Sequence, residues 1–174
     1  MDNIRITSGK YRGRSIKSPN SKLTHPMGAR EKIALFNMIS EFLLNSKVLD
    51  AYAGSGALGI EALSRGAKNV VFVEKSQRTI NIIKQNLEEL GLSNSAKTIV
   101  SDIKNFSLED KFDVIIADPP YDSFEVFGIV QLAELLKDGG IFALSHPGEA
   151  PEIEGLRLQK THKYAGAHIS IYNR

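Results

Sequence analysis

Short apolar runs alternate with longer amphipathic stretches along this chain of 174 residues, and this alternation limits the folds open to it. An apolar run of about seven residues is typical of a buried strand, and an amphipathic stretch after it is typical of a covering helix. Strands that alternate with helices form a mostly parallel sheet with helices on both faces. We therefore expect an α/β fold with seven strands, at residues 47–53, 69–75, 96–102, 112–118, 141–147, 156–164 and 167–174.

Four helices are expected before and between these strands. Their periodic segments span residues 28–43, 56–66, 76–91 and 123–140. Ser76 fits an N-cap for the third helix, and a pair of glycines is expected to end the fourth. In the first helix the apolar spacing predicts a face that packs on the sheet, formed by Ile33, Leu35, Phe36 and Ile39. The last two strands are expected to form a closing antiparallel pair.

The first 32 residues carry an excess of positive charge. They hold eight Lys or Arg against two acids, a net charge of +6, whereas the rest of the chain carries −4. Gly9 and Gly13 interrupt short alternating pieces, which predicts a β-hairpin that Pro19 ends. A basic arm on an acidic body favours a polyanionic partner. We expect one domain over 1–174, with an arm at 1–25, a packing helix at 26–45 and the core at 46–174.

Composition excludes several classes of protein. There is no cysteine, so neither a disulfide framework nor thiolate chemistry is expected, and the four histidines lack metal-binding spacing. No apolar run approaches the ~20 residues of a membrane span. The first ten residues are charged and lack the apolar stretch of a signal peptide. We expect a cytoplasmic monomer without a metal and without a membrane partner.

A glycine-rich turn follows the first core strand. Gly54, Gly56 and Gly59 form a G-x-G-x-x-G pattern, which lets the backbone turn tightly and approach a ligand at a helix N-terminus. The pattern alone fits a nicotinamide or flavin dinucleotide, a smaller adenosyl ligand, or a close-packed turn without a ligand.

Acidic residues end four successive strands of the predicted sheet: Asp50, Glu74, Asp102 and Asp118. Ligands of such sheets bind outside the carboxyl ends of the strands. The charge of Asp50 would repel a pyrophosphate, so the hypothesis of a nicotinamide oxidoreductase does not explain this residue. A sulfonium, an amino group and a ribose diol suit the acids, which favours S-adenosylmethionine. Asp102 alone is equally well explained as a turn residue or helix cap.

The stretches DAYAGSGALGIEALSRG and DPPY together resemble a class I S-adenosylmethionine-dependent methyltransferase that modifies a planar amino group. With RITSGKYRGR, HPMGAREKIALFN and KYAGAHISIY, the whole chain is similar to the RsmD family. The resemblance implies a Rossmann-like fold and methylation of the 2-amino group of a guanine in 16S ribosomal RNA, on a small subunit or an assembly intermediate. It implies a cofactor site formed by Asp50, Ala51, Gly54, Ser55, Gly56, Glu74, Lys75, Asp102, Ile103 and Asp118.

The resemblance assigns the methyl-transfer step to Asp118, Pro119, Pro120 and Tyr121. An exocyclic amine on a purine is a poor nucleophile because its lone pair is delocalised into the ring. The Asp118 side chain and the Pro119 carbonyl can accept the amine's hydrogens, and the prolines fix these acceptors in advance. Tyr121 offers a face for an extruded base. Asp118, with a reference pKa of ~3.9, is expected to be ionised and able to take the released proton.

The resemblance also implies that Arg12, Arg14 and Arg30 bind RNA phosphates and place the base over the pocket. The sequence departs from the family pattern before the first helix, at His25, Met27, Ala29, Lys32 and Ile33. Other functions stay open at this point. They are an adenine-N6 methyltransferase on RNA or DNA, a glutamine methyltransferase, and a non-catalytic RNA-binding assembly factor.

Overall fold

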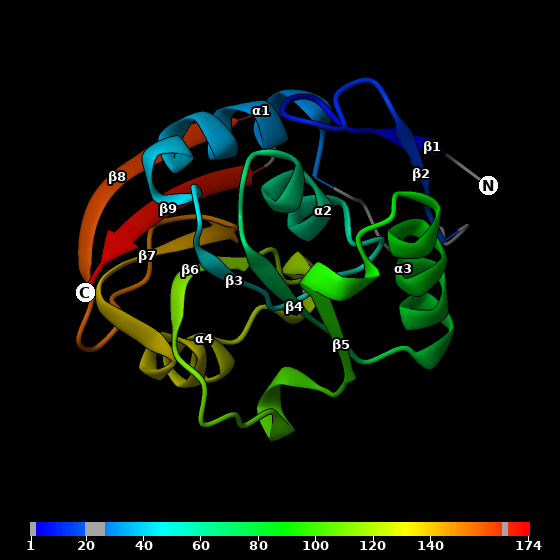
Figure 1. Cartoon of the computed structure of the whole chain (residues 1–174). Coiled ribbons are helices and arrows are strands. Elements are labelled where there is room, and N and C mark those ends of the chain that lie inside the picture. Colours follow the sequence, from blue (N-terminus) through cyan, green and yellow to red (C-terminus); the bar gives the residue numbers. More distant parts are fainter. Residues whose placement is uncertain (1–2, 20–26, 165–166) are drawn as a thin grey trace.

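A seven-stranded sheet forms the centre of the molecule, as predicted (Figure 1). The computed structural model describes residues 3–19, 27–164 and 167–174. The strand order is β5-β4-β3-β6-β7-β9-β8, in which the first five are parallel and β9 pairs antiparallel with β7 and β8. The strands are β3 (Lys47–Asp50), β4 (Asn69–Glu74), β5 (Ala96–Val100), β6 (Phe112–Ala117), β7 (Leu136–His146), β8 (Arg157–Tyr164) and β9 (Ala167–Asn173).

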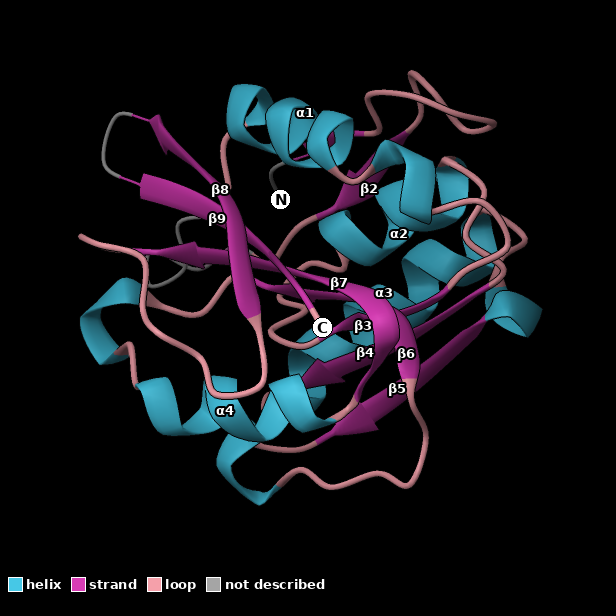
Figure 2. Ribbon diagram, turned by 90° about the vertical axis from the view of Figure 1, so that its left-hand side faces the viewer, coloured by secondary structure: helices cyan, strands magenta, loops and turns pink. Residues whose placement is uncertain are grey.

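Helices cover both faces of this sheet, which confirms the predicted layering (Figure 2). One apolar cluster joins α1 (Ala29–Met38), α2 (Ala57–Ser64) and α3 (Gln77–Glu89) to one face. A second joins α4 (Val126–Glu134) to the other face. Successive strand residues alternate between the clusters, as the pleat requires. Val114 and Ile116 belong to the first, and Ile115 and Ala117 to the second.

Helix α3 begins where the sequence predicts. The Ser76 side chain accepts a hydrogen bond from the Thr79 N–H at 3.2 Å, which satisfies one of the free amides of the first turn. Ile80, Ile83 and Leu87 form the buried stripe at helical spacing. This stripe packs on the same face of the sheet as α1 and α2.

The predicted helix over 123–140 is wrong at both ends. Residues Tyr121–Ser123 form a 3-10 turn, α4 spans Val126–Glu134, and β7 starts at Leu136. Leu136 pairs with Phe112, and the Phe112 N–H donates to the Leu135 carbonyl, so this segment joins the sheet. The register then shifts by a bulge between Phe112 and Val114. The glycines therefore lie in a bulged strand instead of ending a helix.

The buried face of α1 also differs from the prediction. Leu35, Phe36 and Ile39 are buried as expected, but Ile33 is 41% exposed and Lys32 is only 3% exposed. The helix is rotated so that Lys32 faces inward because a buried acid lies opposite. That acid is Glu61 of α2, whose Oε2 lies 3.4 Å from the Lys32 ammonium.

Glu61 joins three elements of the molecule and is fully buried. Its carboxylate accepts bonds from the N–H and hydroxyl of Thr7, from the Ser8 N–H and from Nε of Arg65. Burial alone would raise the pKa of Glu61, but these bonds and the charge of Lys32 outweigh it, and the pKa is lowered. This carboxylate therefore anchors the N-terminal hairpin and α1 to α2.

The predicted N-terminal hairpin is present as a two-stranded sheet of β1 (Asn3–Arg5) and β2 (Ser15–Lys17). Gly9 and Gly13 both have positive φ, at 79° and 85°, which the turn requires. The expected loop at 20–26, which holds His25, lies outside the described residues. Among the described residues no helix is long and apolar enough to cross a membrane.

We expect Gly59→Ala to lower the free energy of unfolding by about 1–3 kcal/mol. A Cβ at Gly59 would lie 2.2 Å from Cε1 of Phe72, whose side chain is fully buried and cannot move aside. Urea denaturation measures the loss. Adding Phe72→Leu should recover part of it because the smaller side chain makes room. If Gly59→Ala left the free energy of unfolding unchanged, α2 and β4 would not be in such close contact.

Candidate active site

Three of the four predicted acids end neighbouring parallel strands at one edge of the sheet. Asp50 ends β3, Glu74 ends β4, and Asp118 follows β6. β3 lies between the other two strands, and Asp50 pairs with Phe72 on one side and Ile116 on the other. The structure therefore brings these carboxylates together at the carboxyl edge, as the sequence predicts.

Asp50 is the deepest of these acids, at 1% exposed. Its Oδ2 accepts a hydrogen bond of 2.8 Å from the Gly59 N–H in the first turn of α2. The pKa of Asp50 is raised to about 7, first by burial and then by the charges of Asp118 and Glu74, against the effect of that bond. The group is therefore a buried carboxylate that a nearby positive charge would stabilise.

The glycine-rich turn lies directly against Glu74. The Gly54 N–H donates to Oε2 of Glu74 at 3.1 Å, and the Ser76 N–H donates to Oε1 at 2.9 Å. Gly54 and Gly56 have φ of 48° and 78°, a conformation that favours glycine. A Cβ at Gly54 would meet only the Tyr52 carbonyl, at 4.0 Å, so this backbone is open to close approach.

The other predicted cofactor residues differ in their surroundings. Ala51 and Ser55 are buried in the turn, and Lys75 is exposed after β4. Asp102 is exposed and accepts a bond from the Lys104 N–H, which makes it the cap of a 3-10 turn, Ile103–Asn105. Ile103 is buried next to α4. Asp102 thus has a structural role whether or not it contacts a ligand.

The DPPY turn leaves the sheet between the glycine-rich turn and β7. Asp118 is partly buried, and burial raises its pKa to about 6, while a hydrogen bond with Ser145 acts in the opposite direction. Pro119 is buried and Pro120 is exposed. The Tyr121 hydroxyl lies 2.5 Å from Oγ of Ser145. The two polar side chains of the motif therefore converge on one buried serine of β7.

Two residues at this edge were missed by the sequence reasoning. Ser145 is 2% exposed and contacts both Asp118 and Tyr121. Its signal was available, because it follows an apolar run just as the acids do. Tyr52, inside the glycine-rich turn, has a pKa raised to about 12, first by burial and then by the charges of Asp102 and Glu125.

The three predicted RNA-binding arginines do not lie together. Arg30 is exposed in the first turn of α1, next to Glu31, whose charge acts on Tyr121. Arg12 and Arg14 lie in the hairpin, which contacts the carboxyl ends of α2 and α3. There the Tyr11 N–H donates to Oγ of Ser64, and Nη2 of Arg14 donates to the Glu89 carbonyl. Only Arg30 is therefore near the DPPY turn.

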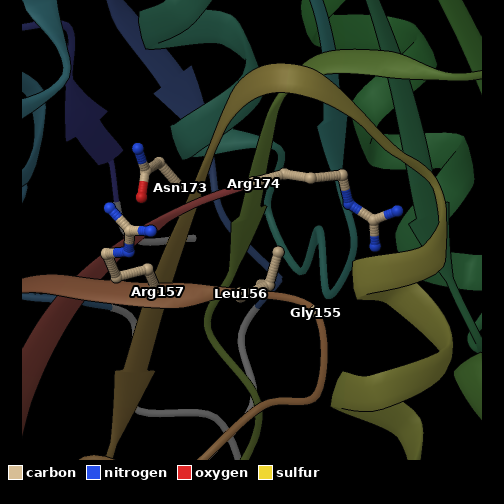
Figure 3. A pocket seen from close by; sticks show the side chains of 5 residues that line it. All are labelled: Gly155, Leu156, Arg157, Asn173 and Arg174. Carbon is tan, nitrogen blue, oxygen red and sulfur yellow. The ribbon is translucent and has the colours of Figure 1, made fainter.

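A surface hollow of about 340 Å³ lies at the opposite edge of the sheet, away from the acids. Gly155, Leu156, Arg157, Asn173 and Arg174 line it. Figure 3 shows Arg157 beside Asn173 and Arg174 pointing away, where its Nη2 donates to the Ala133 carbonyl. Its arginines do not converge on one point, so the hollow offers no anion site. Across the described part of the chain no cluster of three His, Asp or Glu could hold a metal ion.

We expect Asp50→Asn to remove a pH dependence of stability. The folded state holds the Asp50 proton up to about pH 7, while the unfolded chain loses it near ~3.9. Between these values the folded state binds more protons, so the free energy of unfolding falls as pH rises, by about 2–4 kcal/mol from this group. Urea denaturation at pH 5 and pH 8 should show a smaller fall for Asp50→Asn than for wild type. Equal falls would contradict the assignment.

Comparison with known proteins identifies the family. Over 143 residues the chain is 32% identical to "Ribosomal RNA small subunit methyltransferase D" of Escherichia coli K12, covering 80% of this chain and 70% of that protein. A family model described as "Conserved hypothetical protein 95" matches residues 4–173. The chain belongs to the RsmD family. A second relative matches nearly the full length of both chains: "Putative rRNA methyltransferase YlbH" of Bacillus subtilis, 32% identical over 98% of this chain and 99% of that one.

Solved structures place the RsmD-family chain among class I methyltransferases. "Putative methyltransferase yhhF from Escherichia coli" superposes with a TM-score of 0.89 and 25% identity, over 99% of this chain and 98% of that one. A Thermus thermophilus 16S rRNA methyltransferase (RsmC) in complex with AdoMet and guanosine shares the fold, with a TM-score of 0.70 and 22% identity, over 99% of this chain and 50% of that one. The Rossmann-like fold implied by the resemblance is confirmed.

Proposed function

We propose that this protein transfers a methyl group from S-adenosylmethionine to the 2-amino group of a guanine in 16S ribosomal RNA. The observation that carries the proposal is the DPPY turn of an RsmD-family chain, set beside the glycine-rich turn at one sheet edge. Asp118 and Asp50 are close enough for their charges to raise the pKa of Asp50. A cofactor bound at one carboxylate would therefore lie next to an acceptor formed by the other.

The residues present suit S-adenosylmethionine. The ligand carries a sulfonium and an amino group, and Asp50, Glu74 and Asp118 supply negative charge at one edge. Gly54 leaves its backbone open, and the Glu74 carboxylate beside it is the acceptor that a ribose diol needs. A ligand cation would replace the mutual repulsion of these acids with attraction. When bound, the cofactor supplies an activated methyl group.

The chain's own part in the reaction is to position the amine and favour its reactive shape. The Asp118 carboxylate would accept one N–H of the guanine 2-amino group, and the Pro119 carbonyl would accept the other. None of the hydrogen bonds among the described residues uses the Pro119 carbonyl, which supports its being free for this purpose. Two prolines hold the turn, so little ordering remains to be done on binding.

Tyr121 and Asp118 would have further roles in this proposal. The Tyr121 ring would stack on the extruded base, with its hydroxyl held by Ser145. Transfer leaves the amine with one proton too many. Asp118, with a pKa of about 6, is mostly ionised at pH 7 and can take that proton before passing it to water.

RNA binding would involve the arm and the first turn of α1. Arg30 would contact phosphates next to the target base, and Arg12 and Arg14 would contact RNA farther away. So small an arm offers little surface for reading sequence. We infer that the shape of the folded RNA or the ribosomal proteins of the small subunit supply much of the specificity. The enzyme would act as a monomer in the cytoplasm.

Two measurements test the proposed function. Equilibrium binding should detect S-adenosylmethionine and not NADH, because a pyrophosphate would face Asp50 and Glu74. Transfer of labelled methyl groups should be faster to small subunits that lack the modification than to naked 16S rRNA or adenine-rich DNA. Binding of NADH alone would overturn the cofactor. Equal rates on naked RNA and on subunits would overturn the proposed source of specificity.

A further inference from the structure

Ser145 is a buried residue beside the two polar side chains of the DPPY turn. It lies at the carboxyl end of β7, where Ala117 pairs with Leu144 in parallel register, so the next step of the register sets Asp118 beside Ser145. The pleat directs both side chains toward the face that α1 covers, since Ala143 and Ile116 belong to the cluster on that face. The Ser145 hydroxyl follows the buried apolar run Ile141–Leu144 and precedes the buried His146.

The number of protons on Ser145 and its partners determines which group donates in each hydrogen bond. The Tyr121 hydroxyl lies 2.5 Å from Oγ of Ser145, and the strand register sets Asp118 beside Ser145, whose hydroxyl lowers the pKa of that carboxyl. An ionised carboxylate only accepts, so Ser145 gives its single proton to Asp118. Tyr121 must then donate to Ser145. The chain Tyr121→Ser145→Asp118 has one direction while Asp118 is ionised, and each bond polarises the next.

We propose that Ser145 is a positioning residue that orients the Asp118 carboxylate and the Tyr121 ring for methyl transfer. The inference rests on the proposed function for its effect on rate, but not for its effect on Asp118. By occupying one lone pair of the carboxylate, Ser145 leaves the others for the substrate amine. By holding the Tyr121 hydroxyl, it fixes the tilt of the ring on which the base would stack.

The surroundings of Asp118 make Ser145 important for the charge state of the Asp118 carboxyl group. Asp118 faces Asp50 from β3, Ser145 from β7 and Tyr121 from its own turn, while Glu31 of α1 acts on Tyr121. The charge of Glu74 acts on Asp50. Burial favours the protonated form of Asp118, and the Ser145 hydroxyl opposes this effect.

The test is the titration of Asp118 in wild type and in Ser145→Ala, followed by NMR of carboxyl carbons in the full chain. Asp118→Asn assigns the signal. We expect the pKa of Asp118 to rise by about one unit in Ser145→Ala, because a lost hydrogen bond to a charged group is worth about that much. Ser145→Thr keeps a hydroxyl and should restore the wild-type value. If Ser145→Ala unfolds, Ser145→Cys is the second variant, because a thiol donates only weakly and should raise the pKa of Asp118 part of the way.

A matched control is Ser170→Ala on β9. Ser170 is also fully buried, but it bonds to His146 and Thr161 and not to Asp118. Its substitution should leave the Asp118 titration unchanged. A titration that is the same in Ser145→Ala and wild type would overturn the inference, and this reading needs no enzymatic activity.

Activity then tests the positioning role. The acid limb of kcat/KM should move up by about one pH unit in Ser145→Ala, and kcat at pH 8 should fall about tenfold with KM for S-adenosylmethionine nearly unchanged. Ser170→Ala should move neither. If the wild-type protein transferred no methyl group, the proposed function would be wrong. The titration would still show whether Ser145 acts on Asp118. A shifted titration with an unchanged kcat would overturn the positioning role.

Discussion

Replacement of Asp118 by asparagine is expected to lower kcat by about 10³-fold. The carboxylate would accept an N–H of the substrate amine as its nitrogen becomes pyramidal. An asparagine at this position can turn its NH2 group toward the amine, which replaces attraction by repulsion. An interaction made mainly in the transition state lowers kcat more than it lowers substrate binding. Single-turnover transfer of labelled methyl groups to small subunits measures the effect.

Measurement of cofactor binding distinguishes this loss of kcat from a general loss of folded structure. The Kd for S-adenosylmethionine should rise by less than about tenfold in Asp118→Asn, because Asp50, Glu74 and the glycine-rich turn remain. Asp113→Asn is the matched control. Asp113 lies on the same strand at its opposite end, where it accepts from the Lys47 N–H and pairs with Lys137. Its substitution should change kcat less than about twofold. Equal losses in both variants would contradict the assignment.

Replacement of Glu61 by glutamine is expected to lower the free energy of unfolding by about 3–5 kcal/mol. The substitution leaves the Lys32 ammonium, whose side chain is 4% exposed, without its buried partner. Burial already lowers the pKa of Lys32, and the charge of Glu61 is the main effect that opposes this. The substitution also weakens the hydrogen bonds that hold Thr7 and Ser8, and therefore the attachment of the hairpin. Urea denaturation followed by circular dichroism measures the change.

Two further variants show whether the buried pair is the cause. Lys32→Met combined with Glu61→Gln should recover about half of the lost stability or more, because no uncompensated charge remains. Glu89→Gln removes an acid that pairs with Lys17 on the exposed surface, and it should cost less than about 1 kcal/mol. A loss no greater in Glu61→Gln than in Glu89→Gln would show that the buried carboxylate does not anchor the arm.

The sheet and most helices could be predicted because their signals are local. An apolar run followed by an amphipathic stretch predicts a strand and a covering helix, and Ser76 caps α3 as expected. The segment after Glu134 could not be predicted in this way. Its lysine, aspartate and glycines resemble a helix end, but pairing with β6 makes it the start of β7. Pairing between distant strands leaves no mark on the periodicity of one segment.

The site shows the same division between local and distant signals. Asp50, Glu74 and Asp118 could be predicted because each ends an apolar run. Lys32 and Glu61 could not, because each faces the other from a separate helix and the helical spacing favoured Ile33 as the buried residue. The remote position of Arg12 also depends on how the hairpin docks, which charge counting does not reveal.

Identification of the methylated nucleoside is the most direct test of the central claim. The purified protein would be incubated with methyl-labelled S-adenosylmethionine and small ribosomal subunits that lack the modification, with Asp118→Asn in parallel. The RNA would be digested and its nucleosides separated by mass spectrometry. We predict label in 2-methylguanosine with wild type and none with Asp118→Asn. Label in 6-methyladenosine, or none while S-adenosylmethionine binds, would contradict the proposed reaction.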